Sequence, residues 1–261
     1  MLALRPAIIA LGSLVVLGLA ACATPPPASD PDAVADYQEA NDPLEPTNRV
    51  FYAINNGLDT VILRPLAIAY RDGLPLPVRT HVHDVLSNLA EPVQLADNIL
   101  QAKPRTAGNT LMRFMINSTV GIGGIFDVAT DWGYPERGTD AGVTLALWGL
   151  PDGPFLFLPF LGPSSPRDAT GFGMDVGLDP FTYVGQGTAV TALKWSRFGV
   201  SAIDLRAAAL ADIDQIKKTA LDPYATFRSL YRQHRASVIE DSRHDLPATV
   251  PAWFPQPAAP R

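Results

Sequence analysis

The chain has 261 residues, a formal net charge of −6 and a pI of about 5.1, so nucleic acid is not an expected partner. Charged residues make up only 18% of the chain, below the usual value of about 25%, and apolar residues make up 47%, which argues against disorder despite 20 glycines and 25 prolines. A chain of this composition is expected to turn much of its surface toward lipid or a partner.

The first 21 residues have the pattern of an export signal. Residues 1–5 carry one positive charge and no acid, and the apolar stretch at 7–20 is somewhat short for a membrane span. The junction at 19–22, LAAC, resembles a bacterial lipobox, in which the cysteine becomes the acylated first residue. The other interpretation is an ordinary signal peptide that ends beside a cysteine. Cys22 is the only cysteine, which excludes an intramolecular disulfide, and we expect it to be lipidated and to anchor the chain.

The two ends of the mature chain differ from its middle. Residues 22–40 are dominated by Pro, Ala and acids and are expected to form a flexible tether, and residues 242–261 are expected to form a disordered, Pro-rich tail. Residue 23 is Ala; in lipoproteins that this junction resembles, Asp there tends to retain the protein in the inner membrane, so the outer membrane is favoured. Roughly 200 residues, 41–241, remain for one folded domain.

The expected elements are mostly helices. A first helix begins near Asp42 and Pro43, as cap and first turn, and its apolar residues recur at spacings of three and four as far as Ile62. Further helices are expected at 65–71, at 77–89, from Glu91-Pro92 to about Leu100, at 105–119, after Thr139-Asp140, after Ser165-Pro166, at 188–221 and after Asp222-Pro223. Residues 153–160 are aromatic and apolar with Pro on both sides, and are expected to be extended.

Three apolar segments in the mature chain are too short to cross a membrane. They lie at 120–128, 142–150 and 154–162, are broken by Gly or Pro, and have the length of core helices or of interfacial pieces. The Gly-rich stretch in the first segment has two interpretations: a tight helix–helix turn whose glycines supply positive φ, or a mobile loop near lipid.

No catalytic or cofactor motif is found. The sequence has no G-x-S-x-G motif and no phosphate-binding glycine loop. His81 and His83 are two residues apart on an expected helix, so they face away from each other and do not suggest a metal site. The charged stretch with Asp212, Asp214, Lys217 and Lys218 is interpreted as a solvent face. We therefore expect no enzyme activity, no metal and no cofactor.

Several local strings, in this order, resemble the VacJ/MlaA lipoprotein family over about residues 42–231. They are NDPLE at 41–45, NR at 48–49, RP at 64–65, YRD at 70–72, SNLAEP at 87–92, RF at 113–114, Asn117, GIGGIFDVA at 121–129, GP at 153–154, LPFLG at 158–162 and RD at 167–168.

The resemblance implies a mainly α fold: a single helical, ring-like domain with little β structure, embedded in the inner leaflet of the outer membrane, with a central amphipathic channel. It implies an outer-membrane lipoprotein of the Mla system of Gram-negative bacteria, which removes misplaced phospholipid from the outer leaflet and so maintains lipid asymmetry. The implied partners are phospholipid, a soluble periplasmic carrier (MlaC) and, in some members, a trimeric porin. In that fold, the segment resembling 120–128 forms a hairpin beside the channel, which favours the second interpretation of the Gly-rich stretch.

The expected lipid site combines polar groups with this hairpin. We predict that Asn88, Glu91, Arg113 and Asn117 include channel-facing groups; the other interpretation is that they cap helices or pair with one another. The hairpin residues are Gly121, Ile122, Gly123, Gly124, Ile125 and Phe126. Two further hypotheses are a lipid-acting enzyme and a structural lipoprotein that scaffolds a porin or the envelope.

Overall fold

The computed structural model describes residues 40–183 and 187–245, with residues 26, 27, 29, 30, 34 and 37 ahead of them. The predicted signal peptide, Cys22, most of the tether and the tail beyond residue 245 lie outside the described residues.

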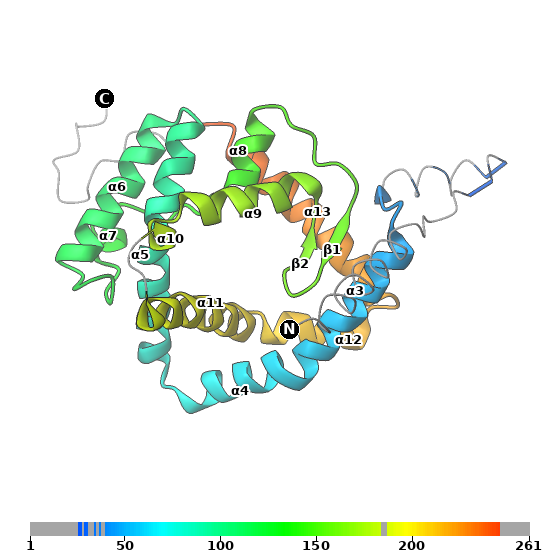
Figure 1. Ribbon diagram of the computed structural model, residues 1–261, viewed down its shortest axis with the longest axis horizontal. Helices are drawn as coiled ribbons and strands as arrows, with labels where there is room; N and C mark the ends of the chain where they lie inside the picture. The colour runs from blue at the N-terminus through cyan, green and yellow to red at the C-terminus, as the bar shows by residue number, and fades with distance from the viewer. Residues whose placement is uncertain are drawn as a thin grey trace, which may run out of the picture.

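The described helices and one β-hairpin run around a central opening, so the chain forms a ring (Figure 1). Helices α5, α9 and α11 and the hairpin border the opening, α4 lies on the far side of α11, and α6 and α7 lie outside α5. In chain order the elements are α3 (Glu45–Leu58), η1 (Asp59–Leu63), α4 (Arg64–Gly73), α5 (Leu76–Leu100), α6 (Pro104–Thr119), α7 (Val128–Asp131), α8 (Ala141–Leu147), β1 (Leu156–Leu158), β2 (Gly162–Ser164), α9 (Pro166–Leu178), α10 (Pro180–Tyr183), α11 (Thr188–Ala208), α12 (Leu210–Thr219) and α13 (Pro223–Asp241). The prediction of a mainly α, ring-like fold with little β structure is confirmed. Within the described part of the chain, every helix is too short or too polar to span a bilayer.

The first helical segment is longer than predicted. Helix α3 continues through the π-helical turn η1 into α4, where two separate helices were expected. The backbone N–H of Arg64 donates to the carbonyl of Asp59, five residues earlier, and this wider turn lies directly before Pro65. A π turn inside a helix admits a proline that would otherwise clash with the preceding turn.

Asp42 does not cap α3, which begins at Glu45. Its carboxylate is buried and accepts hydrogen bonds from Asn48 Nδ2 (2.7 Å), from the Tyr224 hydroxyl and from Arg228 Nη1 (2.9 Å). The residue therefore joins α3 to α13, because a buried carboxylate is stabilised by several donors rather than by one helix end.

Helix α5 is continuous through Pro92, where the sequence predicted a new helix. A proline inside a helix costs about 3 kcal/mol because it removes one N–H and crowds the carbonyl four residues earlier. Contacts of the neighbouring turn offset this cost: Glu91 accepts from Arg113 Nε at 2.7 Å, and Asn88 donates to Ser118 Oγ at 3.1 Å.

The long helix predicted at 188–221 is two helices, because the chain bends at Ala209. The bend lets Leu210 pack in a buried cluster with Ala67 and Ala207. Tertiary packing therefore overrides a continuous helical pattern.

The charged residues of α12 are only partly a solvent face. Lys217 Nζ lies 2.7 Å from Asp59 Oδ2, and Arg64 Nη2 lies 2.7 Å from Asp214 Oδ2. Arg206 completes the group, with Nε at 2.6 Å from Asp59 Oδ1. These pairs fix α12 and the end of α11 against η1 and α4, which the sequence interpretation missed.

Three predicted helix caps, which depend only on residues close in sequence, are confirmed. The side chains of Asp140, Ser165 and Asp222 accept from the backbone N–H three residues later at the starts of α8, α9 and α13. The expected extended segment forms the antiparallel hairpin β1–β2, in which Leu156 pairs with Ser164.

Two glycines let α8 and α9 touch backbone to backbone. A Cβ atom on Gly171 would lie 2.2 Å from the backbone nitrogen of Gly142, so no other residue fits at position 171 without a shift of one helix. The contact places α9 between the opening and α8 (Figure 1).

The region where α3, the hairpin and α13 meet has an aromatic core. Phe155, Phe157 and Tyr224 are buried, with Tyr52 packed edge-on against Phe157 at a centroid distance of 5.5 Å. Phe51 and Tyr231 cover this cluster.

The α5–α6 pair has the opposite pattern, with polar side chains inside. The buried residues of the two helices are Asn88, Glu91, Asp97, Asn98, Thr106, Ala107, Asn109, Thr110, Arg113, Ile116 and Asn117. Large apolar side chains of the same helices and of the adjoining turn are exposed instead: Ile99, Leu100, Leu111, Met112, Met115 and Val120.

Candidate functional site

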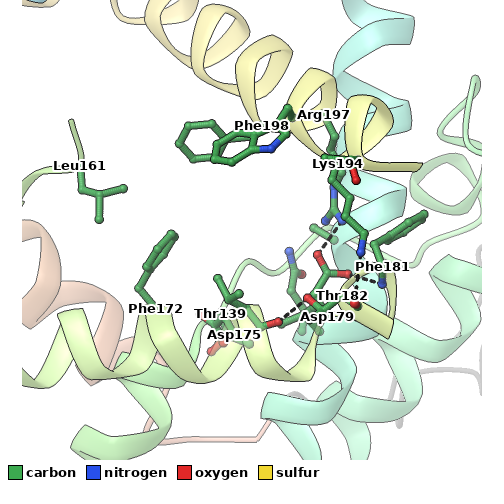
Figure 2. Close-up of a pocket in the computed structure, with 16 residues that line it drawn as sticks. Thr139, Leu161, Phe172, Asp175, Asp179, Phe181, Thr182, Lys194, Arg197 and Phe198 are labelled. Atoms are coloured by element: carbon green, nitrogen blue, oxygen red, sulfur yellow. Dashed lines mark hydrogen bonds and ion pairs between the residues drawn. The ribbon is translucent and has the colours of Figure 1, made fainter. Parts of the chain in front are cut away.

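The ring holds a pocket of about 710 Å³ between α5, α9, α10, α11 and the end of the hairpin (Figure 2). This volume lies within the range of about 300–1,000 Å³ that small-molecule sites usually have. The lining residues come from segments between Ala90 and Phe198, so the pocket exists only once the ring has closed.

One part of the pocket is apolar. Leu161, Phe172 and Phe198 border its open space from the hairpin, α9 and α11 (Figure 2), and Val176 and Trp195 extend the same lining. All five side chains remain exposed although they line a concave site. Exposed aromatic and aliphatic side chains gathered in a cavity are typical of a site for an apolar ligand.

A second cavity, of about 370 Å³, continues the apolar part. It shares Leu161 and Phe198 with the first, and it reaches Ile62 of η1 and Phe157 of the aromatic cluster. Apolar lining therefore extends across the ring from α9 to η1.

The other end of the first pocket is charged (Figure 2). Arg197 Nη1 donates to Asp179 Oδ2 at 2.7 Å, Arg197 Nη2 donates to the carbonyl of Leu89 at 3.2 Å, and the guanidinium lies 4.9 Å from the centre of the Phe181 ring. These contacts join α11 to α5 and to the start of α10.

Lys194 adds a cation at the same end. Its Nζ donates to the carbonyl of Thr182 at 3.1 Å, and no carboxylate of the described residues forms an ion pair with it. The pocket therefore offers a long apolar wall and a charged end that holds an amine without a carboxylate partner, an arrangement suited to an amphiphile with an anionic group.

The four polar residues predicted from sequence are brought together, but in the α5–α6 seam. Arg113 Nε lies 2.7 Å from Glu91 Oε1, and both side chains are only 2% exposed. Burial raises the pKa of Glu91, although the Arg113 charge opposes the shift. Arg113 Nη1 also donates to Thr130 Oγ1 (2.8 Å) and to the carbonyl of Tyr134 (2.7 Å).

The other two predicted residues lie in the same seam. Asn117 donates to Asp127 Oδ1 at 2.9 Å and accepts from the backbone N–H of Ala129 at 2.9 Å. Asn88 donates to Ser118. Only Glu91 and Arg113 pair with each other, whereas Asn88 and Asn117 bond to other residues. None of the four lines the two cavities described above. A role for them in moving lipid stays a prediction.

The Gly-rich stretch between α6 and α7 forms a tight turn with an apolar tip. Gly124 has a φ of +89°, and a Cβ there would lie 2.6 Å from the Asn88 side chain, so only glycine lets the turn approach α5 this closely. Its N–H donates to the carbonyl of Asn117 at 2.8 Å. Gly121, Ile122, Gly123, Ile125 and Phe126 complete the turn, and its three apolar side chains are exposed. The steric need for glycine agrees with the tight-turn interpretation. The exposed apolar tip agrees with the interpretation as a loop near lipid.

The histidine pair has no metal-site geometry. His83 Nδ1 lies 2.9 Å from Asp204 Oδ2, and this hydrogen bond raises the pKa of His83, whereas His81 lies against Asp84 and Phe126. In the part of the chain that the structure describes, no group of three or more His, Cys, Asp or Glu side chains could hold a metal ion.

The pocket residues themselves were not predicted as a site. None of Asp179, Lys194, Trp195 and Arg197 is among the site residues predicted from the sequence. The signal available in the sequence was the interruption of the apolar stripe of 188–208 by Lys194 and Arg197.

The comparisons with known proteins agree with one another. The family model described as MlaA lipoprotein matches residues 40–238. The Escherichia coli (strain K12) protein named intermembrane phospholipid transport system lipoprotein MlaA is 32% identical over 257 residues, which cover 97% of this chain and 92% of that protein. An uncharacterized protein of Rickettsia felis is 37% identical over 202 residues, or 77% of this chain and 79% of that one.

A solved structure, reported under the words "Structural basis for maintenance of bacterial outer membrane lipid asymmetry", is similar with a TM-score of 0.65 and 32% identity. The similarity covers 76% of this chain and 98% of that chain.

Proposed function

Since this chain belongs to the MlaA lipoprotein family, whose named relatives are intermembrane phospholipid transport lipoproteins, we propose that its ring is a passive conduit for phospholipid at the outer membrane. The family resemblance inferred from the sequence is thereby confirmed. In this proposal the ring removes misplaced phospholipid from the outer leaflet, passes it to a soluble MlaC-like carrier in the periplasm, and breaks no bond.

The observation that supports the proposal is the pocket with an apolar wall and a charged end. A phospholipid with two chains of about 16 carbons would lose on the order of 25 kcal/mol of burial on entering water, at about 0.8 kcal/mol per CH₂. Its charged headgroup avoids hydrocarbon for the opposite reason. The apolar lining around Phe172 and Phe198 suits the acyl chains, and Lys194 at the charged end suits the phosphate.

The placement in the membrane is supported by exposed apolar side chains. They occur on α5 and α6, as described above, and on η1 and α4, where Val61 and Leu66 are exposed. Apolar surface of this extent is unfavourable in water and favourable in the hydrocarbon of one leaflet. Acyl chains on Cys22 would hold the ring there without a spanning helix, and a trimeric porin is a further partner in this proposal.

A lipid-transfer assay tests the conduit. The lipidated protein is reconstituted in vesicles that contain a fluorescent phospholipid, and the soluble carrier is added to collect it. Transfer that depends on this protein, with intact phospholipid recovered, supports the proposal. Released fatty acid would indicate an enzyme, and absence of any transfer, with the protein still bound to a porin, would indicate a scaffold.

A pocket-filling variant makes the test specific to the site. Thr191→Trp places an indole in the pocket, and we expect it to slow transfer roughly tenfold, the effect of about 1.4 kcal/mol on a barrier. Gln215→Trp, on an exposed position of α12, is the matched control and should transfer at the normal rate. Equal rates for the two variants would contradict a route through this pocket.

A further inference from the structure

Two carboxyl groups meet where α9 packs against α5: one is fully buried, and the other is half-buried and lines the pocket. Asp97 of α5 is 0% exposed, and its Oδ1 accepts from Thr144 Oγ1 at 3.0 Å. Its Oδ2 is reached by no N–H or hydroxyl donor of the described residues. The carboxyl of Asp175 on α9 lies within hydrogen-bonding reach of the Asp97 carboxyl. Both oxygens of Asp175 also accept from the backbone N–H of Ala141, at 3.1 and 3.3 Å.

A hydrogen bond between two carboxyl groups requires one proton, because an ionised carboxylate is only an acceptor. We propose that Asp97 and Asp175 form a proton-operated clasp that holds α9, a wall of the lipid pocket, against α5 and α8, and releases it when the shared proton leaves. The clasp itself is independent of what the pocket binds, whereas its effect on lipid rests on the proposed function.

The surrounding charges favour keeping the proton. Burial, and then the charge of Asp97, raise the pKa of Asp175 to about 8. Asp140, at the start of α8, adds a further negative charge. The nearby cation of α13, Arg235, is engaged by Asp140 at 2.7 Å and by Asp168 of α9 at 2.8 Å.

The cations of α11 face the same pocket but are engaged by other groups. Arg197 is paired with Asp179, and Lys194 donates to the carbonyl of Thr182. No cation of the described residues forms an ion pair with Asp97 or Asp175. The proton is therefore the positive charge that keeps the two carboxyls together.

Loss of the proton has a mechanical consequence. It leaves two negative charges together, one of them on the fully buried Asp97, where like charges repel more strongly than in water. Asp175 borders both the lipid pocket and a polar cavity of about 220 Å³ beside Tyr231, so water can reach it from either side once the seam loosens. We therefore expect α8 and α9 to loosen together near pH 8.

The first experiment measures the proton directly on lipid-free protein. The carboxyl ¹³C signals of Asp97 and Asp175 are followed by NMR from pH 4 to pH 10. The expected result is one titration near pH 8. In Asp97→Asn, whose amide donates to Asp175 and still accepts from Thr144, the Asp175 midpoint should fall toward its ordinary value near 4. Titration of both carboxyls below pH 5 in the wild-type protein would overturn the proposal.

Stability gives a second readout with a defined sign. Because the folded-state pKa of Asp175 is raised above the unfolded value of 3.8, its stabilising contribution is complete below about pH 4 and is lost as the pH rises to about 8. The melting temperature of the wild-type protein should therefore fall relative to that of Asp97→Asn across this window. Asp212→Asn, on an exposed position of α12, removes the same charge and should follow the wild-type curve.

Amide hydrogen exchange tests the proposed clasp, and lipid transfer tests the proposed conduit. Above pH 8, after correction for the intrinsic rate, α8 and α9 should exchange faster in the wild-type protein and not in Asp97→Asn. Lipid transfer should then change with pH only in the wild-type protein. Unchanged exchange across pH 8 would overturn the clasp, whereas normal exchange behaviour with no transfer at any pH would overturn only the conduit.

Discussion

The α5–α6 pair and the region where α3, the hairpin and α13 meet are built in opposite ways. In the first, Glu91, Arg113 and Asn117 are buried and apolar side chains such as Met115 face outward. In the second, Phe155, Phe157 and Tyr224 are buried, as in a water-soluble domain. The difference indicates that the two regions suit different surroundings: the first matches the proposed contact with hydrocarbon, and the second matches contact with water.

The interior of each region follows from its surroundings. Apolar burial gives little stabilisation to a helix pair that faces hydrocarbon, because lipid tails are as apolar as a leucine side chain. Ion pairs and hydrogen bonds must then join the helices, as Arg113 does with four partners. Where water surrounds the region, burial of aromatic rings supplies the stabilisation.

The largest expected effect comes from breaking the polar interior. Arg113→Met should destabilise the protein by about 3–5 kcal/mol, because it leaves the buried Glu91 and the half-buried Asp127 without their cation. Denaturant unfolding in detergent micelles measures the loss. Arg71→Met, which removes an exposed ion pair with Asp72, is the control and should cost less than about 1 kcal/mol. Equal losses would show that the seam is held by something other than its charges.

A smaller effect is expected from one polar group inside the aromatic region. Tyr224→Phe removes the hydroxyl that donates to the buried carboxylate of Asp42 and keeps the ring. We expect a cost of about 1–3 kcal/mol by the same unfolding measurement. Tyr183→Phe, at a largely exposed position, should change stability by less than about 0.5 kcal/mol. A cost as large as that of Arg113→Met would remove the contrast between the regions.

The smallest effect on stability is expected on the outer face of α6. Met115→Gln, at a side chain that is 51% exposed, should change the free energy of unfolding in detergent by less than about 0.5 kcal/mol but weaken binding of the protein to phospholipid vesicles. Leu230→Gln on α13, 45% exposed, is the matched control and should bind vesicles normally. If both variants lose vesicle binding equally, the two regions do not differ in what they contact.

The sequence predicted the elements whose ends depend on neighbouring residues only. The caps Asp140, Ser165 and Asp222 were correct because a side chain that accepts from the N–H three residues later needs no other part of the fold. The prediction was wrong at Pro92 and Ala209 because tertiary contacts decide whether the helix continues there. The contacts of Glu91 and Asn88 keep α5 continuous through Pro92, and the packing of Leu210 separates α11 from α12.

The site was predictable only in part. The resemblance brought out Asn88, Glu91, Arg113 and Asn117, which the structure does bring together. The pocket was missed because its lining joins α5 to a hairpin and three helices from a later part of the chain, and no local pattern reports where they meet. The Asp97–Asp175 pair was missed for the same reason, since each aspartate alone resembles an ordinary helix-surface residue.

The contact between Gly171 and Gly142 also affects the width of the central opening of the ring. With no side chain between them, α8 and α9 stand as close as two backbones can, and α9 is held as far from the centre as the fold allows. Any larger residue at position 171 would move α9 inward, toward Phe198. In the proposed conduit, the width of the opening would therefore depend on the lack of a side chain at position 171, on the far side of the wall that α9 forms.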